Sequence, residues 1–220
     1  MNNKDKNHSV SRTNLKRIAF LACAFAVALA TVPVWHEVKA TNSKPSAELV
    51  RWDIISTLPG LPIKAGGEAF AFAYNTPGNP SAAWIRLTGA GTFVAPASGG
   101  GSSAVTGGGT WHTSGPGLPE ASGTYRVTKL VNWQFASFNT SPGIDEIADL
   151  NTRANGNAVL VIEYDDGSDG ILGVGCHGPG SPNGILEGVI ASKGYVTYWN
   201  GVLPPGPTVD QNRTVFHVLR

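Results

Sequence analysis

The sequence predicts an all-β fold, an antiparallel meander that closes into a β-barrel, with a β-sandwich as the alternative. Apolar and polar residues alternate with a period of two in successive segments from residue 49 onward. Turn-forming residues separate these segments, and the chain contains 28 Gly and 15 Pro. A Gly-Thr-aromatic triplet recurs at residues 91–93, 109–111 and 123–125. It favours a curved or closed sheet in which a ring from a neighbouring strand covers each bare glycine.

Nine strands are expected, over residues 49–55, 68–74, 84–95, 104–113, 125–138, 158–164, 171–176, 186–199 and 214–219. The most regular is 125–138, whose apolar face is interrupted only by Lys129. That face consists of Tyr125, Val127, Val131, Trp133 and Phe135.

One short helix is expected after Ser141, which is a capping residue. Pro142 suits the first helical position, and Asp145 and Glu146 suit the positive end of the helix dipole. Asn155-Gly156-Asn157 ends the segment.

The Asp166-Gly167 dipeptide predicts a two-residue type I′ turn in a hairpin. With these residues at the tip, Ile162 lies opposite Ile171. Because side chains alternate along a strand, this register places His177 on the face of Ile162 and Cys176 on the opposite face.

Residues 1–40 have the pattern of a secretory signal peptide. A basic segment (1–17) precedes an apolar run (18–30), and Val38-Lys39-Ala40 is a small-residue exit, with Ala28-Leu29-Ala30 as an earlier one. The alternative is an uncleaved anchor, since the apolar stretch to residue 35 approaches the length of a membrane span. We expect a secreted or periplasmic protein with one domain over residues 41–220.

The charge balance argues against a nucleic-acid partner. The chain has 16 basic and 15 acidic residues, whereas nucleic-acid binders show a basic excess. Residues 1–40 contain six of the basic and two of the acidic residues, so the remaining chain has a formal net charge of −3. No membrane contact is expected after removal of the leader, and the sequence indicates no oligomeric state.

A cysteine, the histidines and an acidic stretch are the residue types here that most often carry chemistry. Cys176 and His177 are adjacent, so in a strand they point to opposite faces and cannot pair; a buried, unreactive thiol is expected. His112, His177 and His217 lack the spacing of zinc ligands. The acidic stretch 165–170 is explained by its turn rather than by calcium. We expect no metal and no cofactor.

Five polar residues are the candidates for contact with a ligand. Arg126, Asn132 and Gln134 lie opposite the apolar face of the most regular strand, where they either face water or line a cavity. His177 and Tyr164 share the other candidate face. A polar ring on an apolar face needs a partner, because an unpaired buried polar group costs about 1–3 kcal/mol. His177 is therefore the leading ligand-contact candidate.

These observations favour a small-ligand-binding module for an apolar or amphipathic molecule. The alternatives are an enzyme, either a barrel isomerase or cyclase or a hydrolase that uses His177 or His217, and a structural or adhesive surface protein.

The chain resembles an uncharacterised family of exported bacterial all-β proteins. The resemblance rests on Arg51-Trp52-Asp53-Ile54-Ile55, Gly173-Val174-Gly175-Cys176-His177, Ala191-Ser192-Lys193-Gly194 and Thr214-Val215-Phe216-His217-Val218-Leu219. It transfers no activity and no functional residue. The expected architecture is also similar to the barrels of allene-oxide-cyclase-like and dirigent-like proteins, a likeness that concerns fold alone.

Export is tested by N-terminal sequencing of the secreted protein. Cleavage after Ala40 is expected to give Thr41-Asn42-Ser43 as the new terminus. A full-length chain retained in the membrane would instead support the anchor.

Overall fold

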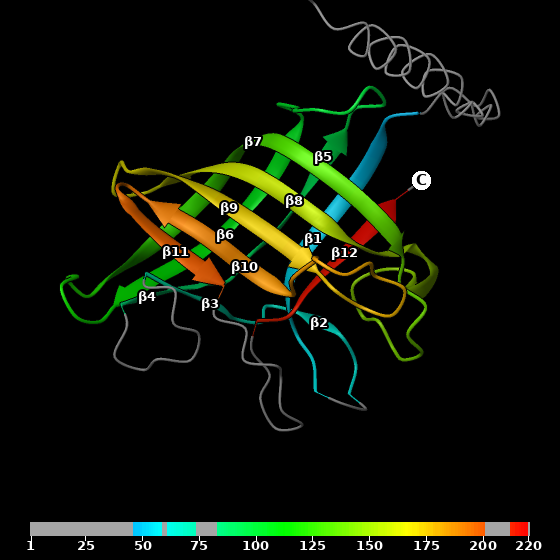
Figure 1. Ribbon diagram of the computed structural model, residues 1–220, viewed down its shortest axis with the longest axis horizontal. Coiled ribbons are helices and arrows are strands. Elements are labelled where there is room, and N and C mark those ends of the chain that lie inside the picture. The colour runs from blue at the N-terminus through cyan, green and yellow to red at the C-terminus, as the bar shows by residue number, and fades with distance from the viewer. Residues whose placement is uncertain (1–45, 59–60, 74–82, 201–211, 220) are drawn as a thin grey trace, which may run out of the picture. The chain divides into compact units, whose positions relative to one another are not determined.

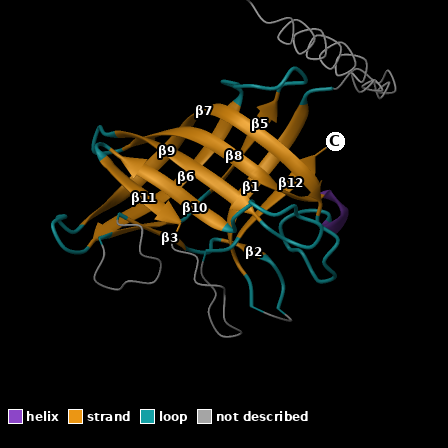
Figure 2. Cartoon of the chain, in the orientation of Figure 1, coloured by secondary structure: helices purple, strands orange, loops and turns teal. Residues whose placement is uncertain are grey.

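A computed structural model describes residues 46–58, 61–73, 83–200 and 212–219 (Figure 1). The expected leader and both of its candidate cleavage sites lie outside these residues. Within these residues strands dominate, joined by loops and one helical turn (Figure 2). The elements are β1 (Glu48–Ser56), β2 (Lys64–Ala65), β3 (Ala69–Phe72), β4 (Trp84–Leu87), β5 (Ala90–Ala95), β6 (Val105–Ser114), β7 (Ala121–Phe138), the 3₁₀ turn η1 (Leu150–Thr152), β8 (Arg153–Tyr164), β9 (Asp169–Cys176), β10 (Gly188–Lys193), β11 (Val196–Asn200) and β12 (Thr214–Leu219).

The strands form one antiparallel sheet that closes into a ring. Strands β6, β7 and β8 pair in series and are shared by two circuits. One circuit returns from β8 to β6 through β12, β1 and β5, and the other through β9, β10, β11, β3 and β4. The all-β antiparallel prediction is confirmed. The described chain has twelve strands rather than nine, because two expected strands each divide and β2 is added.

Both divided strands break at glycine. The expected strand 84–95 separates into β4 and β5 at Thr88-Gly89, where Gly89 has φ +156°. The expected strand 186–199 is a hairpin, β10–β11, whose turn contains Gly194 at φ +55°. A single glycine in a strand pattern is compatible with one bent strand or with two strands joined by a turn. The sequence pattern alone therefore did not distinguish one long strand from two shorter ones.

The prediction of a helix after Ser141 is wrong. The described loop contains only the turn η1, and the backbone near Asp145 pairs with Ile63 as an isolated parallel bridge. The Asp145 side chain accepts hydrogen bonds from the amides of Ile147 and Ala148, as in a local turn. These tertiary and local bonds occupy the groups that a helix would use.

Strand β7 contains bulges that keep the charged Lys129 out of the apolar core. Its register against β8 shifts between Val127 and Lys129 and again between Leu130 and Asn132. Each bulge inserts one residue and reverses which side faces inward. Leu130 is consequently fully buried and Lys129 is exposed, whereas Val131 is 42% exposed. The predicted apolar face is therefore correct at Tyr125, Val127 and Trp133, which pack in the core, and wrong at Val131 and Phe135, which are exposed.

The hairpin between β8 and β9 has a different turn from the one expected. Tyr164 and Ser168 flank a three-residue loop that ends in Gly167 at φ +84°, and Gly167 N donates to Tyr164 O. This is a type I turn with a glycine bulge. Ile162 consequently lies opposite Gly170 rather than Ile171.

Side chains fill the interior of the ring. The largest fully buried side chains among the described residues include Trp52, Phe93, Phe216 and Tyr198. Trp133 packs against Phe216 with ring centroids 4.6 Å apart. The enclosed face of the sheet is thus a packed apolar core.

Bulky rings in this core lie opposite glycines, as the triplet pattern predicted. The pairs are Trp52 with Gly91, Tyr125 with Gly109 and Trp111 with Gly123. The missing side chain lets the neighbouring backbone approach closely, and the opposite ring occupies the space above it.

Gly109→Ala tests this close packing. A Cβ there would lie 1.9 Å from Thr88 O, so we expect a loss of more than about 3 kcal/mol of unfolding free energy in urea. Gly117→Ala is the control, because its Cβ would have no atom within 4 Å and only its φ of +78° is strained, at a cost of about 1 kcal/mol. Equal losses in the two variants would contradict the close approach.

Candidate functional site

The polar candidates on β7 do not enter the ring. Arg126 is exposed and forms an ion pair with Glu163 on β8. Gln134 is exposed, and its amide donates to the side-chain oxygen of partly buried Asn132 at 3.4 Å. Of the two placements left open by the sequence, the water-facing one therefore holds for Arg126 and Gln134.

Tyr164 belongs to the core rather than to an open cavity. It is 4% exposed, and its hydroxyl donates to Ser192 O at 2.9 Å. Lys193 Nζ lies 4.9 Å from the centre of its ring and 4.2 Å from that of Trp111, a cation–π arrangement. Burial raises the pKa of Tyr164 above its ordinary value, so its phenol stays protonated. Each of these contacts anchors the hairpin formed by β8 and β9.

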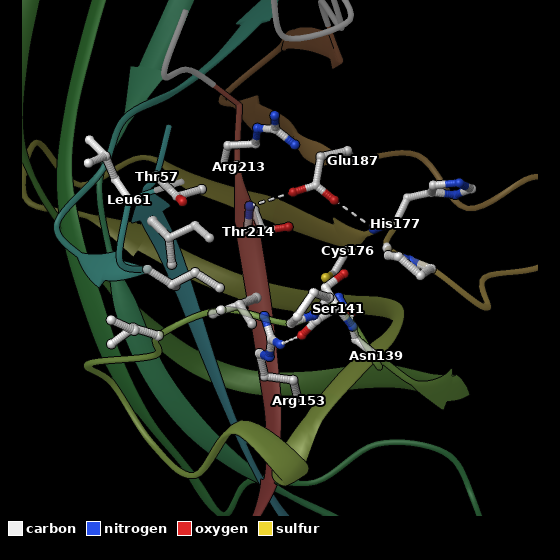
Figure 3. A pocket seen from close by; sticks show the side chains of 18 of the residues that line it. Thr57, Leu61, Asn139, Ser141, Arg153, Cys176, His177, Glu187, Arg213 and Thr214 are labelled. Carbon is white, nitrogen blue, oxygen red and sulfur yellow. Dashed lines mark hydrogen bonds between the residues drawn. The ribbon is translucent and has the colours of Figure 1, made fainter. Parts of the chain in front are cut away.

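The predicted placement of His177 on the face of Ile162 is wrong, because that face is the buried one. The one-residue change in hairpin register puts Cys176 inside, and His177 is exposed beyond the end of β9. The His177 ring donates from Nδ1 to Ile185 O at 2.9 Å. It stands at the rim of a pocket, where Figure 3 shows it turned away from the pocket centre.

This pocket, which we call the rim pocket, lies between the loops that follow β1, β7 and β9 and the start of β12. Its volume is about 300 Å³, near the lower end of the range for small-ligand sites. Its lining residues are Ile55, Thr57, Leu58, Leu61, Ile63, Asn139, Ser141, Pro142, Gly143, Ile144, Arg153, Cys176, His177, Gly178, Pro179, Glu187, Arg213, Thr214 and Val215. Apolar side chains thus surround a few charged and polar groups.

Glu187 is held in the rim pocket by backbone amides. Its Oε1 accepts from Thr214 N at 2.7 Å and its Oε2 from His177 N at 2.6 Å, as the dashed lines in Figure 3 mark. Burial raises the pKa of Glu187 to about 7, against the opposing effect of these two amides and of the Arg213 charge. A carboxyl group that titrates near neutral pH in a pocket is typical of functional sites.

Arg213 extends into the same part of the pocket as Glu187 (Figure 3). Its Nε atom is buried and has no hydrogen-bond acceptor within the described part of the chain. The preceding residue, Asn212, has φ 55° and is 7% exposed, and it binds the amide of Phe70 and the carbonyl of Glu68. These bonds fix the backbone that projects the guanidinium group.

Cys176 is buried, as expected. It is 3% exposed, and burial raises the pKa of its thiol above the ordinary value. Its Sγ lies 4.0 Å from Asn155 Oδ1, which also accepts from Gly178 N. This environment disfavours the reactive thiolate.

The three histidines of the described chain do not meet. His112 on β6 contacts Arg86 and Glu120, whereas His217 on β12 is fully buried beside Asp145. Nowhere in the described ranges do three His, Cys, Asp or Glu side chains gather closely enough to hold a metal ion.

Reasoning from the sequence did not identify the two main charged side chains of the rim pocket, Glu187 and Arg213. Glu187 and Arg213 lie beside turn- and loop-forming segments, and no local spacing connects them. The nearest signal was Cys176-His177, which does mark the strand end at which the pocket opens.

No family model, curated protein or solved structure matches this chain. Among the described residues, no helix has the length and apolar character needed to cross a membrane.

Glu187→Gln tests the buried carboxyl group through the pH dependence of stability. Its folded pKa of about 7 lies above the ordinary 4.5, so the folded state holds the proton more tightly. The resulting stabilisation is complete at acid pH and is lost as the pH rises through 7. As the pH rises through 7, we expect ionisation of Glu187 to lower the unfolding free energy of wild type by on the order of 2 kcal/mol. The Glu187→Gln variant has no carboxyl group at this position, so we expect this decrease to be absent.

The measurement is urea unfolding at a series of pH values, with Glu163→Gln, which alters an exposed carboxylate, as the control. The same pH dependence in wild type and Glu187→Gln would contradict the assignment.

Proposed function

We propose that this chain is an exported small-ligand-binding protein and that its site is the rim pocket, outside the ring. Of the two expected ligand classes, apolar and amphipathic, the amphipathic one suits a pocket that combines apolar walls with a few fixed polar groups. The packed core leaves no role for the ring interior in this proposal.

The ligand in this proposal carries an anionic group, such as a carboxylate, that pairs with Arg213. The supporting observation is the buried Nε of Arg213, which lacks an acceptor among the described residues. A buried donor without a partner is unfavourable, and a carboxylate satisfies a guanidinium group through two parallel hydrogen bonds. Arg153, on the opposite side of the pocket in Figure 3, already donates to Ser141 O.

The apolar part of the ligand contacts the mouth of the pocket. Leu61 and Ile144 line the pocket and are 58% and 65% exposed. Covering such side chains contributes about 25 cal/mol per Å² of apolar surface. The proposal therefore favours a compact organic acid over an inorganic anion.

Benzoate is a suitable probe, with benzyl alcohol as its uncharged counterpart. We expect benzoate to shift the NMR signals of the Arg213 Nε–H group and of the Thr214 amide, and benzyl alcohol to bind more weakly. Arg213→Gln is expected to weaken benzoate binding at least about tenfold, since charged hydrogen bonds contribute about 1.5–3 kcal/mol.

Arg126→Gln is the matched control, because Arg126 is an exposed arginine on the outer face. Benzoate affinity is also expected to rise as the pH falls through 7, since protonation of Glu187 removes a negative charge beside the ligand. Equal binding of benzoate to wild type and Arg213→Gln would contradict the proposal.

A further inference from the structure

A second cavity lies beside the turn η1 and strand β12, which are neighbours in Figure 2. Its volume is about 670 Å³, within the range of small-molecule sites. Phe138, Leu150 and Val218 provide apolar walls, and the described lining residues include amides and hydroxyls but no charged side chain. We call it the turn cavity.

Thr152 lies at this cavity, and its hydroxyl is beside a histidine. Thr152 lines the turn cavity, and its Oγ1 is 3.1 Å from Nδ1 of His217. The same oxygen is 2.7 Å from Asp149 O. The hydroxyl has one proton, which can therefore be donated to either acceptor.

The other nitrogen of His217 faces a carboxylate. His217 Nε2 is 3.6 Å from Asp145 Oδ2, and the two side chains are 0% and 1% exposed. Neither atom has a closer hydrogen-bond partner in the described structure. Asp145 itself is held in place, because its Oδ1 accepts from the amides of Ile147 and Ala148.

This arrangement selects one tautomer of the neutral imidazole. A proton on Nδ1 would leave two acceptors, Nε2 and Asp145 Oδ2, facing each other in a buried site. A proton on Nε2 points instead at the Asp145 carboxylate and leaves the Nδ1 lone pair facing Thr152. Orienting a base in this way is the part that the carboxylate plays in a catalytic triad.

His217 also has the protonation state that a general base needs. Burial lowers its pKa below the ordinary value, although Asp145 and Asp53 oppose this effect. The other charged groups near it are Arg51 on β1 and Arg153 on β8, which also lower the pKa. The imidazole is consequently uncharged at neutral pH and able to accept a proton.

We propose that Thr152, His217 and Asp145 form a nucleophile–base–carboxylate relay that hydrolyses small uncharged carboxylic esters in the turn cavity. Thr152 Oγ1 attacks the carbonyl carbon while its proton passes to His217 Nδ1. The carbon–oxygen bond to the alcohol then breaks, and the alcohol leaves with that proton. Water attacks the acyl-threonine with His217 as base, which releases the acid and returns the proton to Thr152.

The character of the turn cavity sets the substrate class. Its described lining has no cation to bind a phosphate or carboxylate and no anion to bind an amine. Apolar walls beside the reacting hydroxyl suit a short acyl chain. A neutral ester of a short-chain acid therefore fits better than a phosphoester or a charged peptide.

The test uses p-nitrophenyl butyrate with the full chain. We expect a burst of p-nitrophenol, followed by slower turnover, and mass spectrometry is expected to locate one butyryl group on Thr152. Thr152→Val is expected to lose the burst and at least about a hundredfold in rate, since it keeps the side-chain shape and removes the nucleophile. Thr152→Ser restores a hydroxyl and is expected to retain acylation.

Thr106→Val is the matched control, because Thr106 is an exposed threonine on β6 and does not line the turn cavity. It is expected to acylate like wild type, and thermal melting of every variant verifies folding. A burst in folded Thr152→Val, butyryl located on another residue, or no acylation of wild type would each overturn the relay.

Asp145 acts through His217 as a positioning residue, and its test is a pH profile. The rate is expected to rise with pH as His217 loses its proton. Asp145→Asn removes a charge that raises the pKa of His217, so the midpoint of its residual activity is expected at lower pH. An unchanged midpoint in Asp145→Asn, with rate lost only in proportion to lost folding, would overturn this role.

Discussion

The fixed position of Asp145 against Arg153 and His217 is the constraint on which both cavities depend. Asp145 Oδ2 lies 3.8 Å from Arg153 Nε and 3.6 Å from His217 Nε2, and all three side chains are at most 3% exposed. Leaving one member of such a buried set without its partners costs about 3–5 kcal/mol. These contacts hold segment 139–152 against the outer face of β8 and β12. The segment supplies walls to the rim pocket on one side and to the turn cavity on the other.

The ring beneath this segment acts as a rigid support. Its interior is occupied by rings and aliphatic side chains, and its glycines allow close approach of neighbouring strands. Loops at the strand ends then carry the polar groups, as is usual where a stable scaffold positions a site. The charged groups of the rim pocket and the hydroxyl of Thr152 all lie at such ends.

The sequence predicted the sheet because alternation and glycine–aromatic pairing are local or short-range signals. The pairs of Tyr125 with Gly109 and of Trp111 with Gly123 were anticipated in kind from the repeated triplet. The position of His177 was not predicted correctly. A three-residue turn shifts the register of β9 by one residue relative to a two-residue turn, and a shift of one residue exchanges the two faces of the strand.

Bulges and tertiary contacts account for the remaining differences. Register shifts on either side of Leu130 bury this residue in place of Val131, and alternation counting has no means to detect an inserted residue. The helix after Ser141 was expected from favourable capping residues, yet pairing with Ile63 and the buried position of Asp145 determined the conformation. Glu187 and Arg213 meet only through the fold, so no sequence spacing revealed their pocket.

Hydrogen–deuterium exchange of wild type and Asp145→Asn tests most directly whether this buried set holds segment 139–152 in place. The account predicts faster exchange in the Asp145→Asn variant at the amides of Ile147, Ala148 and Thr152, with the amides of the β7–β8 core unchanged. Exchange that stays the same throughout segment 139–152, or that rises equally across the core strands, would contradict it.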